Sequence, residues 1–169
     1  IKTNKKVTRT DLTTLDTISL HRELTKIKTL GIDNVILEAS SHGLEQGRLN
    51  GLNFKIAIFT NFSQDHLDYH KNMKAYLNAK LILFSKLLKK NNYIITDNKI
   101  PEFLKLKKIK KKNNLKLLSI GSENSTIQFK KVVPKGNFQN IIFKYNRKNY
   151  EVKIPLIGLF QIKNLFMSI

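Results

Sequence analysis

The sequence predicts an α/β fold, with a parallel doubly wound (Rossmann-like) sheet, helices on both faces of the sheet, and an appended antiparallel β segment. Three observations support this prediction. Up to residue 121, short apolar runs alternate with helical patterns, which is typical of parallel sheets with helical crossovers. After residue 122, strand-like runs follow one another across short turns. The 169 residues, of which 41% are apolar, are enough for one domain with a core.

The first predicted elements are a helix over residues 15–31 and a strand over 34–39. Leu and Ile recur near a helical period in "LDTISLHRELTKIKTLG", where Asp16 is suited to cap the start and Gly31 to end the helix. "NVILEA" is a short apolar run of the kind found in buried parallel strands. Residues 1–14 are polar and Thr-rich, which is typical of a loop or an edge strand.

The other elements follow from the same patterns. They are a strand over 54–61, a helix over 72–88, a strand over 92–97, a Lys-rich helix over roughly 101–112 and a strand over 115–121. "STIQFKKVV", "NIIFKYN" and "YEVKIPL" predict antiparallel strands, and a last helix starts near Phe160. The predicted division is therefore an α/β part over 1–121, an antiparallel part over 122–157 and the start of the last helix over 158–169.

The net charge of +19 raises the alternative of a basic nucleic-acid-binding module. Nucleic-acid readers usually use Arg, whose planar fork pairs with phosphate and guanine. Only four of the 31 basic residues are Arg, and the Lys residues occur with abundant Asn and Ile. We therefore interpret the charge as compositional bias and "KLKKIKKKNN" as a solvated helix face, and we expect no nucleic-acid partner.

Several features of the sequence predict where the protein is located and whether the chain is part of a longer protein. Cys is absent, which excludes disulfides and thiolate zinc sites. The sequence has no apolar run of the ~18 residues that a membrane span needs and no signal peptide, so we expect a cytoplasmic protein without a membrane partner. The first residue is Ile, and "GLFQIKNLFMSI" stops within an amphipathic helical pattern. We therefore expect a piece of a longer protein.

Two polar clusters occur where predicted strands end. One is "LEASSHGLEQGRLNG" (37–51), and the other is "TNFSQDH" within "IAIFTNFSQDHLDYH" (56–70). In open α/β sheets, ligands bind outside the carboxyl ends of the strands. The two strands are consecutive and right-handed crossovers are the rule, so their ends are expected to be neighbours. Glu38 and His66 are therefore predicted to share a cleft.

Two interpretations of Glu38 and His66 stay open from the residues alone. One carboxylate and one imidazole suit a divalent ion whose other ligands are water and phosphate oxygens, although His is an unusual ligand for Mg²⁺. Alternatively, Glu38 caps a helix that starts at Ser40 or His42, and His66 pairs with Asp68. A Ser-His-Asp hydrolase is disfavoured, because the sequence lacks a G-x-S-x-G elbow. The phosphate loop G-x-x-x-x-G-K-[ST] is also missing from the chain.

The stretch over residues 37–84 resembles the central domain of the Mur ligases, and most closely the MurE branch of that family. "S-S-H-G-L-x-Q-x-R" and "F-T-N-x-S-x-D-H-L-D-Y-H" are specific when they occur together. "TTLDTISLHREL" resembles the family's Thr-Thr segment with its following helix, and "IPLIGLFQIKN" resembles its G-x-F-N-x-x-N entry to the last helix of the domain. The resemblance frames nearly the whole chain and is weak over 98–150.

The resemblance implies an ATP-dependent amide-bond ligase of peptidoglycan precursor synthesis. Such an enzyme adds diaminopimelate or lysine to the D-Glu γ-carboxyl of UDP-MurNAc-L-Ala-D-Glu through an acyl phosphate, with ATP and Mg²⁺ as cofactors. The parent protein would be monomeric, and the chain would be inactive alone because the phosphate loop and the C-terminal domain are missing from it. A related Mur or folylpolyglutamate-type ligase with another substrate is the nearest alternative.

The resemblance also implies roles for individual residues. Glu38 and His66 would bind magnesium, and Lys80 would be a carbamylated lysine that serves catalysis and a second metal ion. The residues that would bind substrate or nucleotide are Thr13, Thr14, Ser40, Gln46 and Arg48 for the UDP-MurNAc dipeptide and Asn164 for the adenine. The chain departs from the family pattern at Gln161, where relatives have Asn, and at Leu15, where many relatives have Pro.

Overall fold

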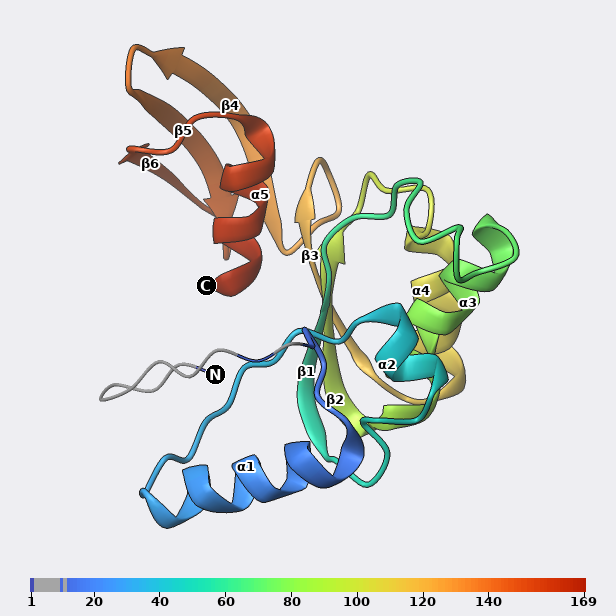
Figure 1. Cartoon of the computed structure of the whole chain (residues 1–169). Coiled ribbons are helices and arrows are strands. Elements are labelled where there is room, and N and C mark those ends of the chain that lie inside the picture. The colour runs from blue at the N-terminus through green and yellow to red at the C-terminus, as the bar shows by residue number, and fades with distance from the viewer. Residues whose placement is uncertain (2–9, 11) are drawn as a thin grey trace. The chain divides into compact units, whose positions relative to one another are not determined.

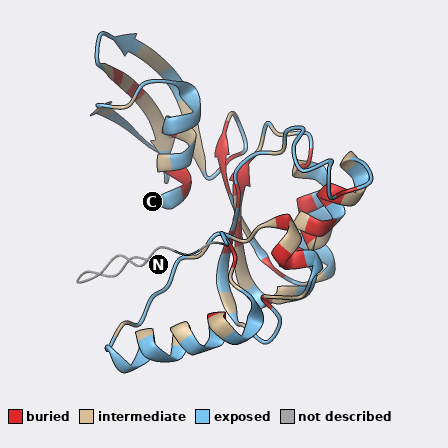
Figure 2. Ribbon diagram, in the orientation of Figure 1, coloured by how far each residue is buried: buried red, intermediate tan, exposed pale blue. Residues whose placement is uncertain are grey.

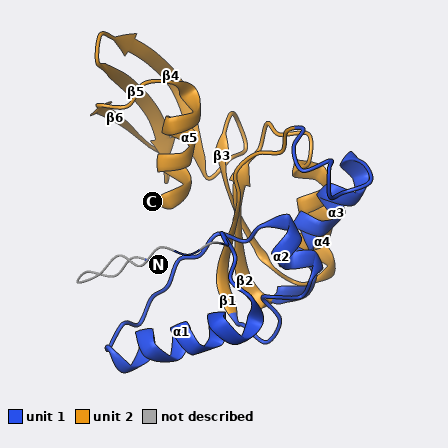
Figure 3. Cartoon of the chain, viewed as in Figure 1, with its two compact units in different colours: residues 1–53, 64–87 blue, residues 54–63, 88–169 orange. Residues whose placement is uncertain are grey.

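The computed structural model describes residues 1, 10 and 12–169 of the chain (Figure 1). The described elements form two compact units (Figure 3). The first unit comprises residues 1–53 and 64–87, and the second comprises residues 54–63 and 88–169. The polar clusters of the sequence fall mainly in the first unit, and the sheet forms the second. Every helix in the described part of the chain is too short or too polar to span a bilayer.

A single mixed sheet organises the second unit. Its strands, in spatial and chain order, are β1 (Phe54–Phe59), β2 (Leu88–Asp97), β3 (Lys116–Gly121), β4 (Ile127–Lys135), β5 (Phe138–Tyr145) and β6 (Lys148–Ile154). β1 to β4 pair in parallel, and β4 to β6 pair in antiparallel fashion. The predicted parallel α/β sheet with an appended antiparallel segment is thereby confirmed.

The strand predicted over residues 34–39 is not formed, and that prediction is wrong. Residues 32–40 have no regular secondary structure, and Ile36 is 99% exposed. A parallel strand needs a neighbour to bond both its N–H and C=O groups. No described strand pairs with this segment. The apolar pattern of "NVIL" predicted a buried strand, but Val35 is 44% exposed as well, so the burial prediction is also wrong for these residues.

Two helices pack on the sheet within the second unit. α4 (Phe103–Lys112) contacts β2 and β3 and inserts the fully buried Leu106, while its Lys side chains are exposed, as predicted for a solvated face. α5 (Leu159–Ser168) buries Ile162, Phe166 and Met167 against Ile120 and Ile141. Figure 2 shows buried stretches of ribbon in the central strands and in α5.

The carboxyl end of β2 carries a buried ion pair. Asp97 is 1% exposed, and its Oδ2 lies 2.5 Å from Nζ of Lys163 on α5. Its Oδ1 accepts a hydrogen bond of 2.8 Å from the Lys99 N–H. Gly121 on β3 has φ +133°, and a Cβ there would lie 2.2 Å from Oδ1 of Asn98 and 2.9 Å from Oδ1 of Asp97. Glycine at 121 therefore allows β3 to approach this pair closely.

Three helices organise the first unit. They are α1 (Thr17–Thr29), α2 (Ser41–Glu45) and α3 (Met73–Ile82), and α3 continues as the π-helical turn η1 (Leu83–Leu87). Asp16 caps α1 as predicted, because its Oδ1 accepts from the Ser19 N–H at 3.0 Å, and this bond lowers the pKa of Asp16. Asn72 caps α3 in the same way, through a bond of 2.9 Å from the Ala75 N–H. The helices predicted over 15–31 and 72–88 are confirmed.

Candidate functional site

A hydrogen-bonded lock fixes the loop before α2. Thr14 is 4% exposed; its hydroxyl donates to the Glu38 carbonyl at 2.9 Å and accepts from the Ser40 N–H at 2.9 Å. Ser40 caps α2 by accepting from the Gly43 N–H at 3.1 Å. A Cβ at Gly43 would lie 2.7 Å from Cγ2 of Thr14, so glycine permits this approach. The alternative in which Glu38 caps the helix is therefore wrong.

Arg48 extends this lock into a longer network. Its NH1 donates to the Thr14 carbonyl at 2.8 Å, and its Nε and NH2 donate to Oε1 of Gln46 at 2.9 and 2.6 Å. Nε2 of Gln46 in turn donates to the hydroxyl of Tyr69 at 3.1 Å. Four of the five residues predicted to bind substrate, namely Thr14, Ser40, Gln46 and Arg48, thus lie in one connected network. The fifth, Thr13, is exposed beside Thr14.

A pocket of about 430 Å³ opens next to the lock. Thr13, Thr14 and Glu38 contribute polar groups to its wall. The apolar part of the wall includes Leu20, Leu24 and Ile27 of α1 together with Val35 and Leu37. A mostly apolar pocket with a few convergent polar groups is the usual form of a small-molecule site.

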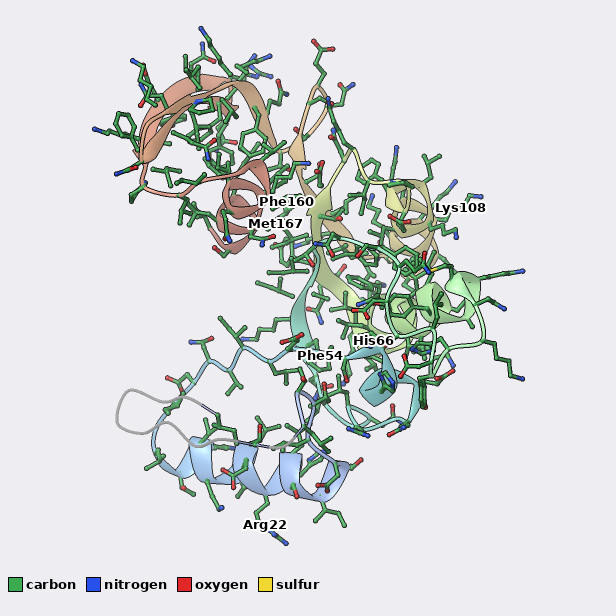
Figure 4. The ribbon with its side chains drawn as sticks, turned by 45° about the horizontal axis from the view of Figure 1, so that its top comes forward. Arg22, Phe54, His66, Lys108, Phe160 and Met167 are labelled. Carbon is green, nitrogen blue, oxygen red and sulfur yellow. The ribbon has the colours of Figure 1, made fainter. Side chains whose placement is uncertain are left out.

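A cluster of aromatic and imidazole rings surrounds the first turn of α2. The ring of His42 lies 5.1 Å from that of His66, 5.4 Å from that of His70 and 3.9 Å from that of Tyr69. Tyr76 of α3 contacts both His66, at 5.7 Å, and His70, at 5.1 Å. The ring of His66 therefore lies against the first turn of α2, which carries His42 (Figure 4).

Lys80 belongs to the same cluster. It is half-buried on α3, and its Nζ lies 5.0 Å from the centre of the Tyr76 ring, whose edge-on partner is His66. The structure therefore brings Lys80 and His66 to one aromatic side chain, which no local spacing in the sequence predicts.

His70 is the buried centre of the cluster, and sequence reasoning did not single it out. Its side chain is 1% exposed; Nε2 lies 2.9 Å from Oγ of Ser41, and Nδ1 lies 3.5 Å from Oε2 of Glu45. Burial lowers the pKa of His70, and the nearby His42, His66 and Lys80 act in the same direction, whereas Glu45 raises it. The motif "DHLDYH", with His at i and i+4, is the signal that could have indicated this position.

His66 pairs with its sequence neighbour Asp65. His66 has φ +53°, its N–H donates to Oδ1 of Asp65 at 2.8 Å, and its Nε2 lies 3.4 Å from Oδ2 of the same residue. The alternative pairing of His66 with Asp68 is therefore wrong. Within residues 12–169 no three His, Asp or Glu side chains converge closely enough to enclose a metal ion. The side chains of Glu38 and His66 are both exposed, and the pocket of about 430 Å³ is lined by Glu38 but not by His66, so a cleft shared by these two residues stays a prediction.

Asn164 lies in the second unit. It is exposed on α5, next to Lys163, which holds Asp97 at the end of β2. Gln161, at the position where the sequence departs from the family pattern, is also exposed on α5. The ion pair fixes this helix to the sheet and thereby fixes the backbone that carries Asn164.

Comparisons with known proteins agree on one family. The sequence profile of the Mur ligase middle domain matches residues 1–169. A UDP-N-acetylmuramoyl-L-alanyl-D-glutamate–2,6-diaminopimelate ligase of Rickettsia bellii is 41% identical over 157 residues, which cover 93% of the chain and 33% of that protein. A solved structure of a ligase with the same name has a TM-score of 0.82 at 30% identity, covering 91% of this chain and 32% of that one. MurF of Thermotoga maritima, solved in complex with ADP, has a TM-score of 0.60 at 15% identity, covering 77% of this chain and 29% of its own, and shares the fold. The chain spans about a third of the length of the curated relatives it matches.

Proposed function

Because the chain belongs to the Mur ligase family through its middle domain, we propose that the protein containing it is an ATP-dependent ligase of peptidoglycan precursor synthesis. The enzyme joins the amine of diaminopimelate to the D-Glu γ-carboxyl of UDP-MurNAc-L-Ala-D-Glu in the cytoplasm. The names of the relatives at 38–41% identity support diaminopimelate over lysine. ATP first phosphorylates the carboxyl group, and the amine then displaces phosphate from the acyl phosphate.

The observation that carries this proposal is the convergence around α2. The Thr14–Arg48 network holds the loop before that helix, and the ring of His66 lies 5.1 Å from that of His42 in its first turn. Phosphoryl transfer depends mainly on positioning and on neutralising charge. Arg48, Gln46 and Ser40 orient the dipeptide through charge-assisted and neutral hydrogen bonds. Asn164 contacts the adenine of ATP.

Glu38 and His66 hold Mg²⁺ in this proposal, and carbamylated Lys80 holds a second ion. When bound, Mg²⁺ neutralises charge on the transferred phosphate oxygens. Lys80 reacts with CO₂ as the neutral amine; a N–C bond forms and one proton leaves, so a cation becomes an anion. Carbamylation thereby replaces the contact of the ammonium with Tyr76, which also contacts His66, by a carboxylate-like group.

Turnover measurements on the full-length protein test the function. We expect release of phosphate from ATP that requires UDP-MurNAc-L-Ala-D-Glu, diaminopimelate and Mg²⁺ together, with formation of the tripeptide product by mass spectrometry. Lysine in place of diaminopimelate is expected to give much slower turnover. Phosphate release that does not depend on UDP-MurNAc-L-Ala-D-Glu would contradict the proposal, and so would the absence of phosphate release by folded protein.

Lys80→Ala is expected to reduce kcat at least about a hundredfold, since it removes a group that stabilises charge in the transition state. Acetate or formate at high concentration should restore part of the activity, because a small carboxylate can occupy the place of the carbamate. Lys74→Ala is the matched control, because Lys74 is exposed on the same helix. Normal activity of Lys80→Ala would show that no carbamate is needed, and loss without rescue would favour a packing role.

A further inference from the structure

We propose that His70 is a positioning residue of the ligase site, which holds the first turn of α2, the 66–70 turn and α3 in the arrangement that the reaction needs. This inference rests on the proposed function for its kinetic consequences. The geometry itself is independent of it, because every contact lies within the first unit. None of the roles assigned to the metal or the substrate uses His70, although it is the most buried of the three clustered imidazoles.

Both ring nitrogens of His70 have a partner on α2. Nε2 lies 2.9 Å from Oγ of Ser41, and Nδ1 lies 3.5 Å from Oε2 of Glu45. A neutral ring with its proton on Nδ1 suits both contacts, because the Ser41 hydroxyl then donates to Nε2 and the N–H at Nδ1 is on the side of the Glu45 carboxylate. The side chain is 1% exposed, so water does not compete for either nitrogen. The ring therefore ties the start and the end of the five-residue helix α2 to the 66–70 turn.

The backbone of His70 also shapes His66. The His70 N–H donates to the His66 carbonyl at 2.9 Å, which closes the turn over residues 66–70. His66 has φ +53°, a left-handed conformation that is unfavourable for a non-glycine residue and persists only where surrounding contacts impose it. The buried ring of His70 anchors this turn. It also stacks on Tyr76 at an interplanar angle of 27°, and Tyr76 in turn contacts His66 and Lys80.

The contacts Ser41–His70–Glu45 join the same types of side chain as the catalytic triad of a hydrolase. Unlike the serine of such a triad, Ser41 is not accessible to a substrate. Ser41 is 1% exposed, so no substrate carbonyl reaches its hydroxyl. A nucleophile must be within contact distance of the reacting atom. His70 consequently acts on the reaction through the residues that it orients. Supporting residues of this kind change activity or metal affinity typically by 10- to 100-fold when removed.

Kinetics of variants of the full-length protein test the proposal. We expect His70→Ala to lower kcat about tenfold or more while KM for UDP-MurNAc-L-Ala-D-Glu changes less than about threefold. The split is expected because the substrate network of Thr14, Gln46 and Arg48 contains no bond to His70 among the described contacts. His70→Gln should recover much of kcat, because its amide can replace the bond to Ser41. His21→Ala is the matched control, since His21 is exposed on α1.

Nitrogen-15 spectra of the histidine rings provide a second readout that does not depend on activity. We expect one histidine of the wild-type protein to show a protonated Nδ1 with an unprotonated Nε2, and Ser41→Ala to shift that Nε2 signal. We also expect the His66 ring signals to shift in His70→Ala but not in His21→Ala. Wild-type kcat in His70→Ala, or unchanged His66 signals in that variant, would overturn the proposal. A folded wild-type protein without ligase turnover would instead refute the proposed function, and the spectra would then decide the role of His70.

Discussion

Asp97→Ala is expected to lower the free energy of unfolding of the chain by about 3 kcal/mol, the lower end of the range for breaking a buried ion pair. The carboxylate is almost fully buried, and it bonds both Lys163 and the Lys99 N–H. Removing it leaves an ammonium and an amide without their partner in a region of low polarity. The Lys163 side chain is 29% exposed, which moderates the loss because water reaches part of the charge.

Urea-induced unfolding, followed by circular dichroism, measures this effect. Glu23→Ala is the control, because it breaks the exposed ion pair with Lys26 and is expected to change the unfolding free energy by less than about 1 kcal/mol. Asp97→Asn should lose less than Asp97→Ala, since the amide oxygen can still accept from Lys99. The double variant Asp97→Ala with Lys163→Met should recover part of the loss. Equal effects of Asp97→Ala and Glu23→Ala would mean that the buried pair does not stabilise the fold.

The sequence predicted those elements well whose stabilising interactions lie within one short segment of the chain. The periodic apolar residues predicted α1 and α3, and the cap Asp16 was predicted for α1, because these residues act within one helix. The same reasoning failed for residues 34–39, since an apolar run indicates burial without naming a neighbour. It also gave no sign of the Asp97–Lys163 pair, whose members are 66 residues apart in sequence and meet only through the packing of α5.

The sequence singled out some residues of the candidate site and missed others, and the basis for selection differs between residues. Glu38 and His66 were selected as polar groups after apolar runs; the strand that was to carry Glu38 is absent, and their metal role stays a prediction. Thr14, Lys80 and Asn164 came from family resemblance alone. His70 and Tyr76 were missed, because a ring contact between the 66–70 turn and α3 depends on how that turn folds back. Spacing within one segment does not encode such contacts.

Glu38→Ala and His66→Ala are each expected to lower kcat by about a hundredfold or more, with activity that rises only at much higher Mg²⁺ concentration. The magnitude is that found when one group stabilising transition-state charge is removed. Both side chains are exposed, so the folded state should be preserved in each variant. Steady-state kinetics over a range of Mg²⁺ concentrations, together with circular dichroism, measure both statements.

The controls for this experiment separate a metal role from general charge. Asp33→Ala removes an exposed carboxylate five residues before Glu38 and should leave turnover unchanged. The Glu38→Ala/His66→Ala double variant is informative because two ligands of one ion act as a unit, so its loss should be smaller than the product of the single losses. Independent, multiplicative losses would indicate separate roles. Wild-type kinetics in both single variants would reject the metal assignment. The residues around α2 would then serve substrate binding alone.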